Sequence, residues 1–222
     1  MSFQMNPTIY FISGLGADKR AFRNLIFPEN FDCIYLDWIQ QLPAETLEQY
    51  ANRISELIDK SQPFYLIGLS FGGMIATEIA KNLNPEHTFL ISSVPVFFQL
   101  PWYYKLAGIL RLQKAFPISL MKTGNSIGLK FLGAKTHDEK LLLKQLIEDS
   151  DPRFVKWALN SILTWRNTIR PDNLTHIHGT LDNILPMKHM IVDHLIKDGS
   201  HFMVYAKADE IRKIIIDIII GR

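Results

Sequence analysis

The stretch that decides the fold reads PFYLIGLSFGGMIA and runs from Pro63 to Ala76. Its first five residues are apolar or aromatic, as expected of a strand that helices cover on both faces. Residues 75–83 then repeat apolar side chains at helical spacing, with polar side chains between them. Between the two lies Gly68–Gly72, which has the form G-x-S-x-G. At a junction of strand and helix this pattern indicates a sharp turn that presents one serine hydroxyl, here that of Ser70, as a candidate nucleophile.

Two glycines flank this turn, and their position has a steric reason. A strained turn in which strand and helix approach closely leaves little room for a Cβ atom, which suits Gly68 and Gly72. The alternative is an ordinary glycine-rich turn with an idle serine, because ordinary Gly and Ser usage produces the pattern in about one of every ten to twenty chains of this length. The turn therefore has to be judged together with the rest of the chain.

Strand-like and helical stretches alternate along the chain. Strands are expected at 8–12, 33–38, 63–67, 87–92, 174–178 and 190–195. Helices are expected at 19–27, at 47–58 behind a capping box of Thr46 and Gln49, after the Ser70 turn, and from about Lys207 onward. This alternation predicts an α/β fold of three layers, with a mostly parallel sheet of about six strands.

Residues 96–170 differ from the rest of the chain. They show helical stretches without strand-like alternation and hold three of the four tryptophans. The segment is too long for an ordinary connection, so we expect a helical cap inserted into one domain, whose core is formed by 1–95 and 171–222. The aromatic residues of this segment either suit an apolar or aromatic substrate group or form the core of the cap itself. They are Phe97, Phe98, Trp102, Tyr103, Tyr104, Phe116, Phe131 and Trp157.

Composition limits the class of function. The chain has 222 residues, of which 47% are hydrophobic and 21% charged, and this is enough for one sizeable core. Lys and Arg number 24, Asp and Glu number 22, and no long basic run alternates with aromatic residues. Nucleic acid and membrane surfaces are therefore not expected as partners, whereas a small-molecule substrate is.

The chain carries no sign of export or of membrane insertion. Its single cysteine, Cys33, excludes an internal disulfide. Residues 1–7 lack the basic and apolar parts of a secretory signal. The apolar run 214–220 is too short to span a bilayer and contains Asp217, so we expect it to be the end of a buried helix. These observations predict a cytoplasmic protein.

A serine nucleophile needs partners, and two later loops offer them. A serine hydroxyl is weakly nucleophilic near neutral pH and needs a base, which a third group in turn orients. Asp182 lies in the loop after the fifth expected strand, and Gly199 precedes His201 in the loop after the sixth. In a parallel sheet both loops fall at the edge where Ser70 is expected. In chain order the candidates read Ser, Asp, His.

Other histidines and aspartates are less well placed. Of the seven histidines, only His201 follows the last expected strand. Asp182 has the spacing Gly-x-x-Asp after a strand, and Ser92-Ser93 provides no carboxylate after the fourth strand. Three other aspartates lack that spacing: Asp172, Asp193 and Asp198. The plainer alternatives are that His201 is a surface turn residue and that Asp182 only forms a turn.

Four motifs together resemble those of a known family. They are Ser13–Gly16 after the first strand, the Gly68–Gly72 turn, the stretch H-G-x-x-D-x-x-x-P from His178 to Pro186, and Gly199-Ser200-His201-Phe202. With them the chain resembles a small member of the α/β-hydrolase superfamily, from Thr8 to the last helix. The resemblance implies a serine hydrolase for a small ester-like substrate, a carboxylester, a thioester or a related compound, without metal or cofactor.

The resemblance also assigns roles to residues. Ser70 is then the nucleophile, His201 the general base and later the acid, and Asp182 the orienting carboxylate. The oxyanion hole falls at the backbone N–H groups of Leu15 and Phe71. Two departures stand out: relatives often begin the first loop with His-Gly, where this chain has Ser13-Gly14, and the two antiparallel edge strands of larger relatives are not expected here.

Two other classes of function compete. Gly14-Leu15-Gly16 after a strand, with Asp37 closing the next strand, imitates a dinucleotide-binding fingerprint, but Lys19 stands where a third Gly or Ala is needed. The second alternative is a module that keeps the fold and only binds a small ligand, because a fold does not guarantee chemistry.

Overall fold

Six parallel strands form the centre of the computed structural model, which describes residues 6–110 and 126–221. Their order across the sheet is β2-β1-β3-β4-β5-β6, and each neighbouring pair is parallel. The strands are β1 (Thr8–Ile12), β2 (Asp32–Leu36), β3 (Phe64–Leu69), β4 (His87–Ile91), β5 (Leu174–Gly179) and β6 (His194–Ile196). The predicted fold class, a parallel sheet of about six strands, is confirmed.

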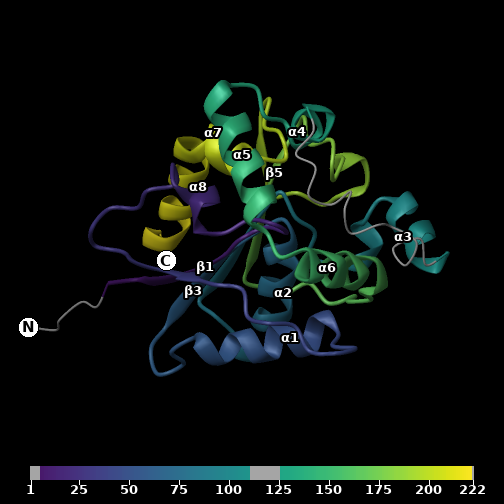
Figure 1. The fold of residues 1–222 in the computed structure, drawn as a ribbon. Coiled ribbons are helices and arrows are strands. Elements are labelled where there is room, and N and C mark those ends of the chain that lie inside the picture. Colours follow the sequence, from purple (N-terminus) through teal and green to yellow (C-terminus); the bar gives the residue numbers. More distant parts are fainter. Residues whose placement is uncertain (1–5, 111–125, 222) are drawn as a thin grey trace, which may run out of the picture.

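Helices cover both faces of this sheet, which makes three layers (Figure 1). On one face α1 (Leu47–Ile54), α2 (Phe71–Leu83) and α6 (Pro152–Thr164) bury apolar side chains. On the other face lie η1 (Lys19–Phe22), α5 (His137–Asp149), α7 (Met203–Ala206) and α8 (Ala208–Ile220). The other helices in the described residues are η2 (Ser55–Leu57), η3 (Phe97–Gln99), α3 (Trp102–Ile109), α4 (Ser126–Leu132) and η6 (Met187–His189).

Alternate side chains along a strand pack into the two apolar cores, one on each face of the sheet. In β1, for example, Phe11 packs in the core under α8, whereas Tyr10 and Ile12 pack in the core with α1 and α2. β3 lies between β1 and β4, so Leu66 is opposite Tyr10 on one side and Thr88 on the other. Strands in such a position are buried on both faces, which explains why residues 64–69 are almost continuously apolar.

Local sequence sets the start of several helices. Thr46 accepts a hydrogen bond from the Gln49 amide, and the Gln49 side chain accepts one from the Thr46 amide, which confirms the predicted capping box of α1. A second capping box joins Thr136 and Glu139 at the start of α5. Such caps satisfy N–H groups that have no partner within the helix.

Between β4 and β5 the chain forms η3 and α3–α6, without a strand in the residues described there. Contacts of Trp157 and Leu132 tie this segment to the rest of the chain. The indole Nε1 of Trp157 donates to the Glu45 carbonyl at 2.8 Å, and the Trp157 ring packs against Tyr50 with 4.5 Å between ring centroids. At the other end, the Phe202 amide donates to the Leu132 carbonyl at 3.0 Å.

Two predicted elements differ from the structure. The helix expected at 19–27 is only the single turn η1, because Arg23 and Leu25 donate to carbonyls three residues earlier and the chain continues as turns. The strand expected at 190–195 is β6, which begins at His194. It begins late because the Asp193 carboxylate accepts the hydrogen bond of the His176 amide at 2.7 Å, in place of a strand carbonyl.

The glycines of the Ser70 turn stand where the chain leaves no space. A Cβ on Gly68 would lie 2.5 Å from the Gly73 Cα, and one on Gly72 would lie 2.2 Å from the Ser13 carbonyl oxygen. The obstacle is backbone in both cases, so it cannot rotate away. The strand, the helix and the first loop therefore meet at contact distance around Ser70, which confirms the steric reason given for these glycines.

We predict that Gly72→Ala destabilises the protein by about 3 kcal/mol, because backbone has to shift to admit the methyl group. Gly14→Ala is the matched control, since its Cβ would meet no atom closer than 3.5 Å. Urea unfolding followed by circular dichroism measures both. Equal stabilities of the two variants would contradict the contact described here.

Candidate active site

Ser70 joins β3 to α2 in a backbone conformation that non-glycine residues rarely adopt. Its φ is +52° and its ψ is −117°. Three hydrogen bonds hold this conformation. The Ser70 amide donates to the Ile91 carbonyl at 2.9 Å, while the Ser70 carbonyl accepts the Gly73 amide at 2.9 Å and the Ser93 hydroxyl at 2.6 Å. The strained turn thus presents the partly exposed serine hydroxyl at the carboxyl end of the sheet.

The structure brings the three predicted side chains into one hydrogen-bonded chain. Ser70 Oγ lies 2.9 Å from His201 Nε2, and His201 Nδ1 lies 2.8 Å from Asp182 Oδ2. With Nδ1–H donating to the carboxylate, a neutral imidazole leaves Nε2 free to accept the serine hydroxyl proton. The distances are those required between a nucleophile, a base and an orienting group.

Asp182 is buried, and its charge is nevertheless stabilised. Its Oδ1 accepts hydrogen bonds from the amides of Ile184 at 2.9 Å and Leu185 at 2.8 Å. Burial on its own would raise the pKa of Asp182, but the charge of His201 and the hydrogen bonds from His201 and Leu185 outweigh it and hold the pKa below its usual value. The carboxylate is therefore ionised near neutral pH.

The loops that carry Asp182 and His201 are fastened to each other. The Leu181 amide donates to the Gly199 carbonyl at 2.8 Å, and the Thr180 amide to the Ile196 carbonyl at 3.1 Å. The hydrogen bond from the Phe202 amide to the Leu132 carbonyl adds a support from the end of α4. The imidazole is thus held from two directions. The sequence did not indicate the contribution of α4.

The first loop lies against Ser70, as the expected oxyanion hole requires. A Cβ on Gly14 would be 3.5 Å from the Ser70 Cβ. The Ser13 hydroxyl donates to the Ala17 carbonyl at 2.8 Å, and the Ala17 amide donates to the Gly14 carbonyl at 3.0 Å, so Ser13 itself closes the loop. Phe71 is the first residue of α2, where amides have no partner within the helix. The roles of Leu15 and Phe71 as oxyanion donors stay a prediction.

Two histidines behind the carboxylate were not singled out from the sequence. His178 Nε2 lies 2.8 Å from the Leu185 carbonyl oxygen and 3.4 Å from Asp182 Oδ2. His176 Nε2 lies 3.1 Å from His178 Nδ1, and His176 Nδ1 lies 3.1 Å from the Ile191 carbonyl oxygen. Their spacing of two residues within a strand was the available signal, because it places both rings on one face of β5.

Both rings are buried, and burial decides their charge. Burial, followed by the charge of His178, lowers the pKa of His176 to about 4. Burial also lowers the pKa of His178, against the opposing charge of Asp182. His176 is therefore neutral near pH 7. The pair contacts the 182–185 turn through His178, which lies against the Leu185 carbonyl and against the same Asp182 oxygen as His201.

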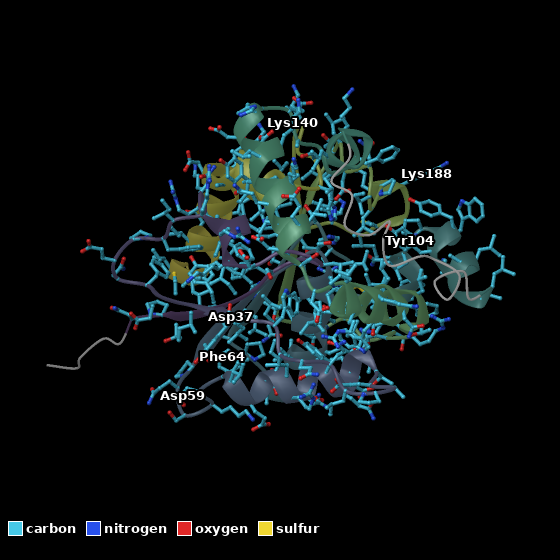
Figure 2. All side chains as sticks on the ribbon, viewed as in Figure 1. Asp37, Asp59, Phe64, Tyr104, Lys140 and Lys188 are labelled. Carbon is cyan, nitrogen blue, oxygen red and sulfur yellow. The ribbon has the colours of Figure 1, made fainter. Side chains whose placement is uncertain are left out.

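α3 also reaches this loop. The hydroxyl of Tyr104, labelled in Figure 2, donates to the Ile184 carbonyl at 3.3 Å. Burial raises the pKa of Tyr104 to about 12, so the hydroxyl keeps its proton.

The aromatic residues of the segment 96–170 divide into two groups. Phe97, Tyr104 and Trp157 pack against the apolar core under α1 and α2. Phe98, Trp102, Tyr103 and Phe131 are exposed. Phe116 lies outside the described residues. The first group therefore packs on the core that the segment shares with the sheet, and not in a separate core of the segment.

Within 6–110 and 126–221, no group of three or more His, Cys, Asp and Glu side chains is arranged to hold a metal ion. No helix formed by these residues has both the length and the apolar character needed to cross a bilayer.

Comparison with known proteins agrees with this geometry. A model of the alpha/beta hydrolase family matches residues 9–214. The chain belongs to the alpha/beta hydrolase family. Membership supports hydrolase activity. No curated protein matches the chain at a significant level.

Solved structures of other alpha/beta hydrolases share the fold at low sequence identity. A lipase-esterase related protein from Clostridium acetobutylicum has 19% identity and a TM-score of 0.70, covering 96% of this chain and 95% of that one. A thermophilic esterase from Thermogutta terrifontis has 17% identity and a TM-score of 0.68, covering 97% and 90%. A hydrolase from Oleispira antarctica has 15% identity and a TM-score of 0.71, covering 97% and 92%. At these identities the likeness concerns the fold alone.

The family does not favour the dinucleotide alternative, and the first loop gives a physical reason. The turn at 14–16 leads into η1, a single turn of four residues, and not into a helix whose N-terminus could hold a pyrophosphate. The Asp18 carboxylate occupies the start of η1 and accepts the Arg20 amide at 2.9 Å. Asp37, which would bind the ribose, is exposed at the surface beyond β2 (Figure 2).

We predict that His176 makes this alpha/beta hydrolase less stable in acid. Its pKa is about 4 in the folded protein against an ordinary value of 6.5, so between these values the unfolded chain binds more protons. Stability is therefore complete above about pH 6.5 and falls as the pH drops toward about 4, by about 3 kcal/mol from this group.

Urea unfolding at about pH 7 and about pH 4.5 tests this in the wild type and in His176→Gln. The variant is expected to lose less stability on acidification than the wild type. His137→Gln, on an exposed position of α5, is the control and should follow the wild type. An identical acid loss in His176→Gln and wild type would refute the assignment.

Proposed function

We propose that the protein is a serine hydrolase that cleaves a small ester-like substrate through Ser70, His201 and Asp182. The observation that carries the proposal is the continuous chain of contacts from Ser70 Oγ to His201 to Asp182, at 2.9 Å and 2.8 Å. Membership in the alpha/beta hydrolase family supports it. We further propose that residues 96–170 act as a cap over a core of 1–95 and 171–222, and that the protein works in the cytoplasm without a cofactor.

The first half of the reaction forms an acyl-enzyme. Ser70 Oγ attacks the carbonyl carbon of the substrate while His201 Nε2 takes the hydroxyl proton. The negative charge passes to the carbonyl oxygen, which the amides of Leu15 and Phe71 stabilise, a contribution of about 3 kcal/mol for each donor. Collapse of this intermediate breaks the bond to the leaving group, whose oxygen or sulfur receives the proton from His201.

The second half restores the enzyme. Water attacks the acyl carbon and gives a proton to His201, and collapse of the second tetrahedral intermediate releases the carboxylic acid and returns the proton to Ser70 Oγ. Asp182 keeps its negative charge throughout, because two amides and the imidazole stabilise the carboxylate. Its part is to hold the imidazole in one tautomer and to stabilise the imidazolium that forms in each half.

We predict that Ser70→Ala and His201→Gln each lower the turnover of p-nitrophenyl acetate by roughly three to six orders of magnitude, and that the double variant is no worse than either one. Circular dichroism and urea unfolding check that the variants fold. Activity near that of the wild type in both variants would refute the roles of Ser70 and His201, whereas a folded wild-type protein without turnover would leave a ligand-binding module as the better description.

We predict that Asp182→Asn lowers kcat by roughly three to four orders of magnitude, because an amide can donate to His201 Nδ1 and hold the wrong tautomer. Asp198→Asn is the matched control, since this exposed residue lies between β6 and His201, and asparagine tolerates its φ of +57°. Steady-state kinetics on the same ester compare the two. Equal activities would exclude Asp182 as the orienting group.

A further inference from the structure

A small apolar cavity opens directly beside the nucleophile. It touches Ser70, His201 and the first loop at 14–17, and its volume is about 70 Å³. Its apolar walls come from β3, from the end of α4 and from α5. They include Leu69, Leu132, Leu143, Leu146 and Ile147.

The walls of this cavity are fixed by packing. Leu146 and Ile147 lie three and four positions after Leu143 and so lie on the same face of α5 as Leu143. Leu143 and Leu146 are 6% and 2% exposed and belong to the same core as Leu69 and Phe202. Close-packed side chains of this kind leave little freedom to enlarge a neighbouring space. The volume therefore limits what can enter beside Ser70.

The volume corresponds to a short carbon chain. An apolar cavity of about 150 Å³ holds one benzene molecule, so about 70 Å³ holds about three carbons. In the proposed reaction the carbonyl carbon lies between Ser70 Oγ and the Leu15 and Phe71 amides. The three carbons that the cavity holds beyond it are those of a butanoyl group. None of the aromatic residues described in the segment 96–170 lines the cavity, and Phe202, which does, lies in the loop after β6. The expectation that the aromatic residues of this segment suit an apolar or aromatic substrate group therefore finds no support at this position.

The acyl part of the substrate, and not the alcohol, fits this cavity. In the reaction proposed above, the acyl group stays bonded to Ser70 Oγ and its carbonyl oxygen stays at the first loop. Ser70 and the first loop both line the cavity. The leaving group has to move away after taking its proton from His201. A space walled by core side chains suits the group that remains.

We propose that the enzyme is selective for short acyl groups, from acetyl to butanoyl, and that Leu143, one of three α5 side chains that line the cavity, contributes to the upper limit of length. This inference rests on the proposed function. It differs from a general esterase activity in that the acyl chain, and not the alcohol, controls the rate.

Two ester series test the proposal on the intact protein. With p-nitrophenol as the constant leaving group, kcat/KM is expected to fall by at least about tenfold from butanoate to hexanoate and again to octanoate. With acetate as the constant acyl group, lengthening the alcohol from ethyl to octyl should change kcat/KM by less than about tenfold. If kcat/KM does not depend on acyl length, or if it depends strongly on alcohol length, the acyl selectivity is overturned while the hydrolase proposal stands. No turnover in either series overturns both.

Two variants of α5 test whether Leu143 limits the length of the acyl chain. Leu143→Ala enlarges the cavity and should raise the ratio of hexanoate to butanoate turnover by at least about tenfold. Leu142→Ala removes an equally buried side chain of the same core that does not line the cavity, so it should leave this ratio within about twofold of the wild type. The ratio compares two substrates on one enzyme, so a loss of stability alone does not change it. Equal ratios in the two variants overturn the role of Leu143.

Discussion

The strained backbone of Ser70 is the constraint on which the rest of the site depends. A residue at φ +52° persists only where its surroundings hold it, and here a strand carbonyl, a helix amide and the Ser93 hydroxyl do so. The same turn forces glycine at 68 and 72, because the strand, the helix and the first loop meet there at contact distance. The strain at Ser70, the close packing around it and the position of its hydroxyl therefore have one cause in the fold.

The partners of Ser70 reach it because parallel strands end at one edge of the sheet. Loops after β3, β5 and β6 carry the hydroxyl, the carboxylate and the imidazole to that edge. Segments far away in sequence then fix them, since the end of α4 holds the loop of His201 through Phe202 and α3 reaches the loop of Asp182 through Tyr104. The segment between β4 and β5 thus contributes both to the support of the site and to the walls of its cavity.

The three side chains of the site could be predicted from the sequence because the patterns that indicate them are local. A buried strand, a G-x-S-x-G turn and a polar residue after each later strand are all visible within a few residues, and the structure brings Ser70, Asp182 and His201 together as predicted. The features that could not be predicted depend on contacts over long distances in the chain. Three examples are the hydrogen bond from the Ser93 hydroxyl to the Ser70 carbonyl, the hydrogen bond from the Phe202 amide to the Leu132 carbonyl, and the late start of β6 after Asp193. They follow from tertiary packing that no local pattern encodes.

The central claim is that the Ser70 hydroxyl is activated by its neighbours and becomes covalently bonded during the reaction. Mass spectrometry of the protein after treatment with a fluorophosphonate tests it most directly, because such reagents form a stable bond with an activated serine. The account predicts one adduct per chain, located on Ser70, and no adduct in Ser70→Ala or in His201→Gln over the same time. An unlabelled wild-type protein, or an adduct on another residue, would contradict it.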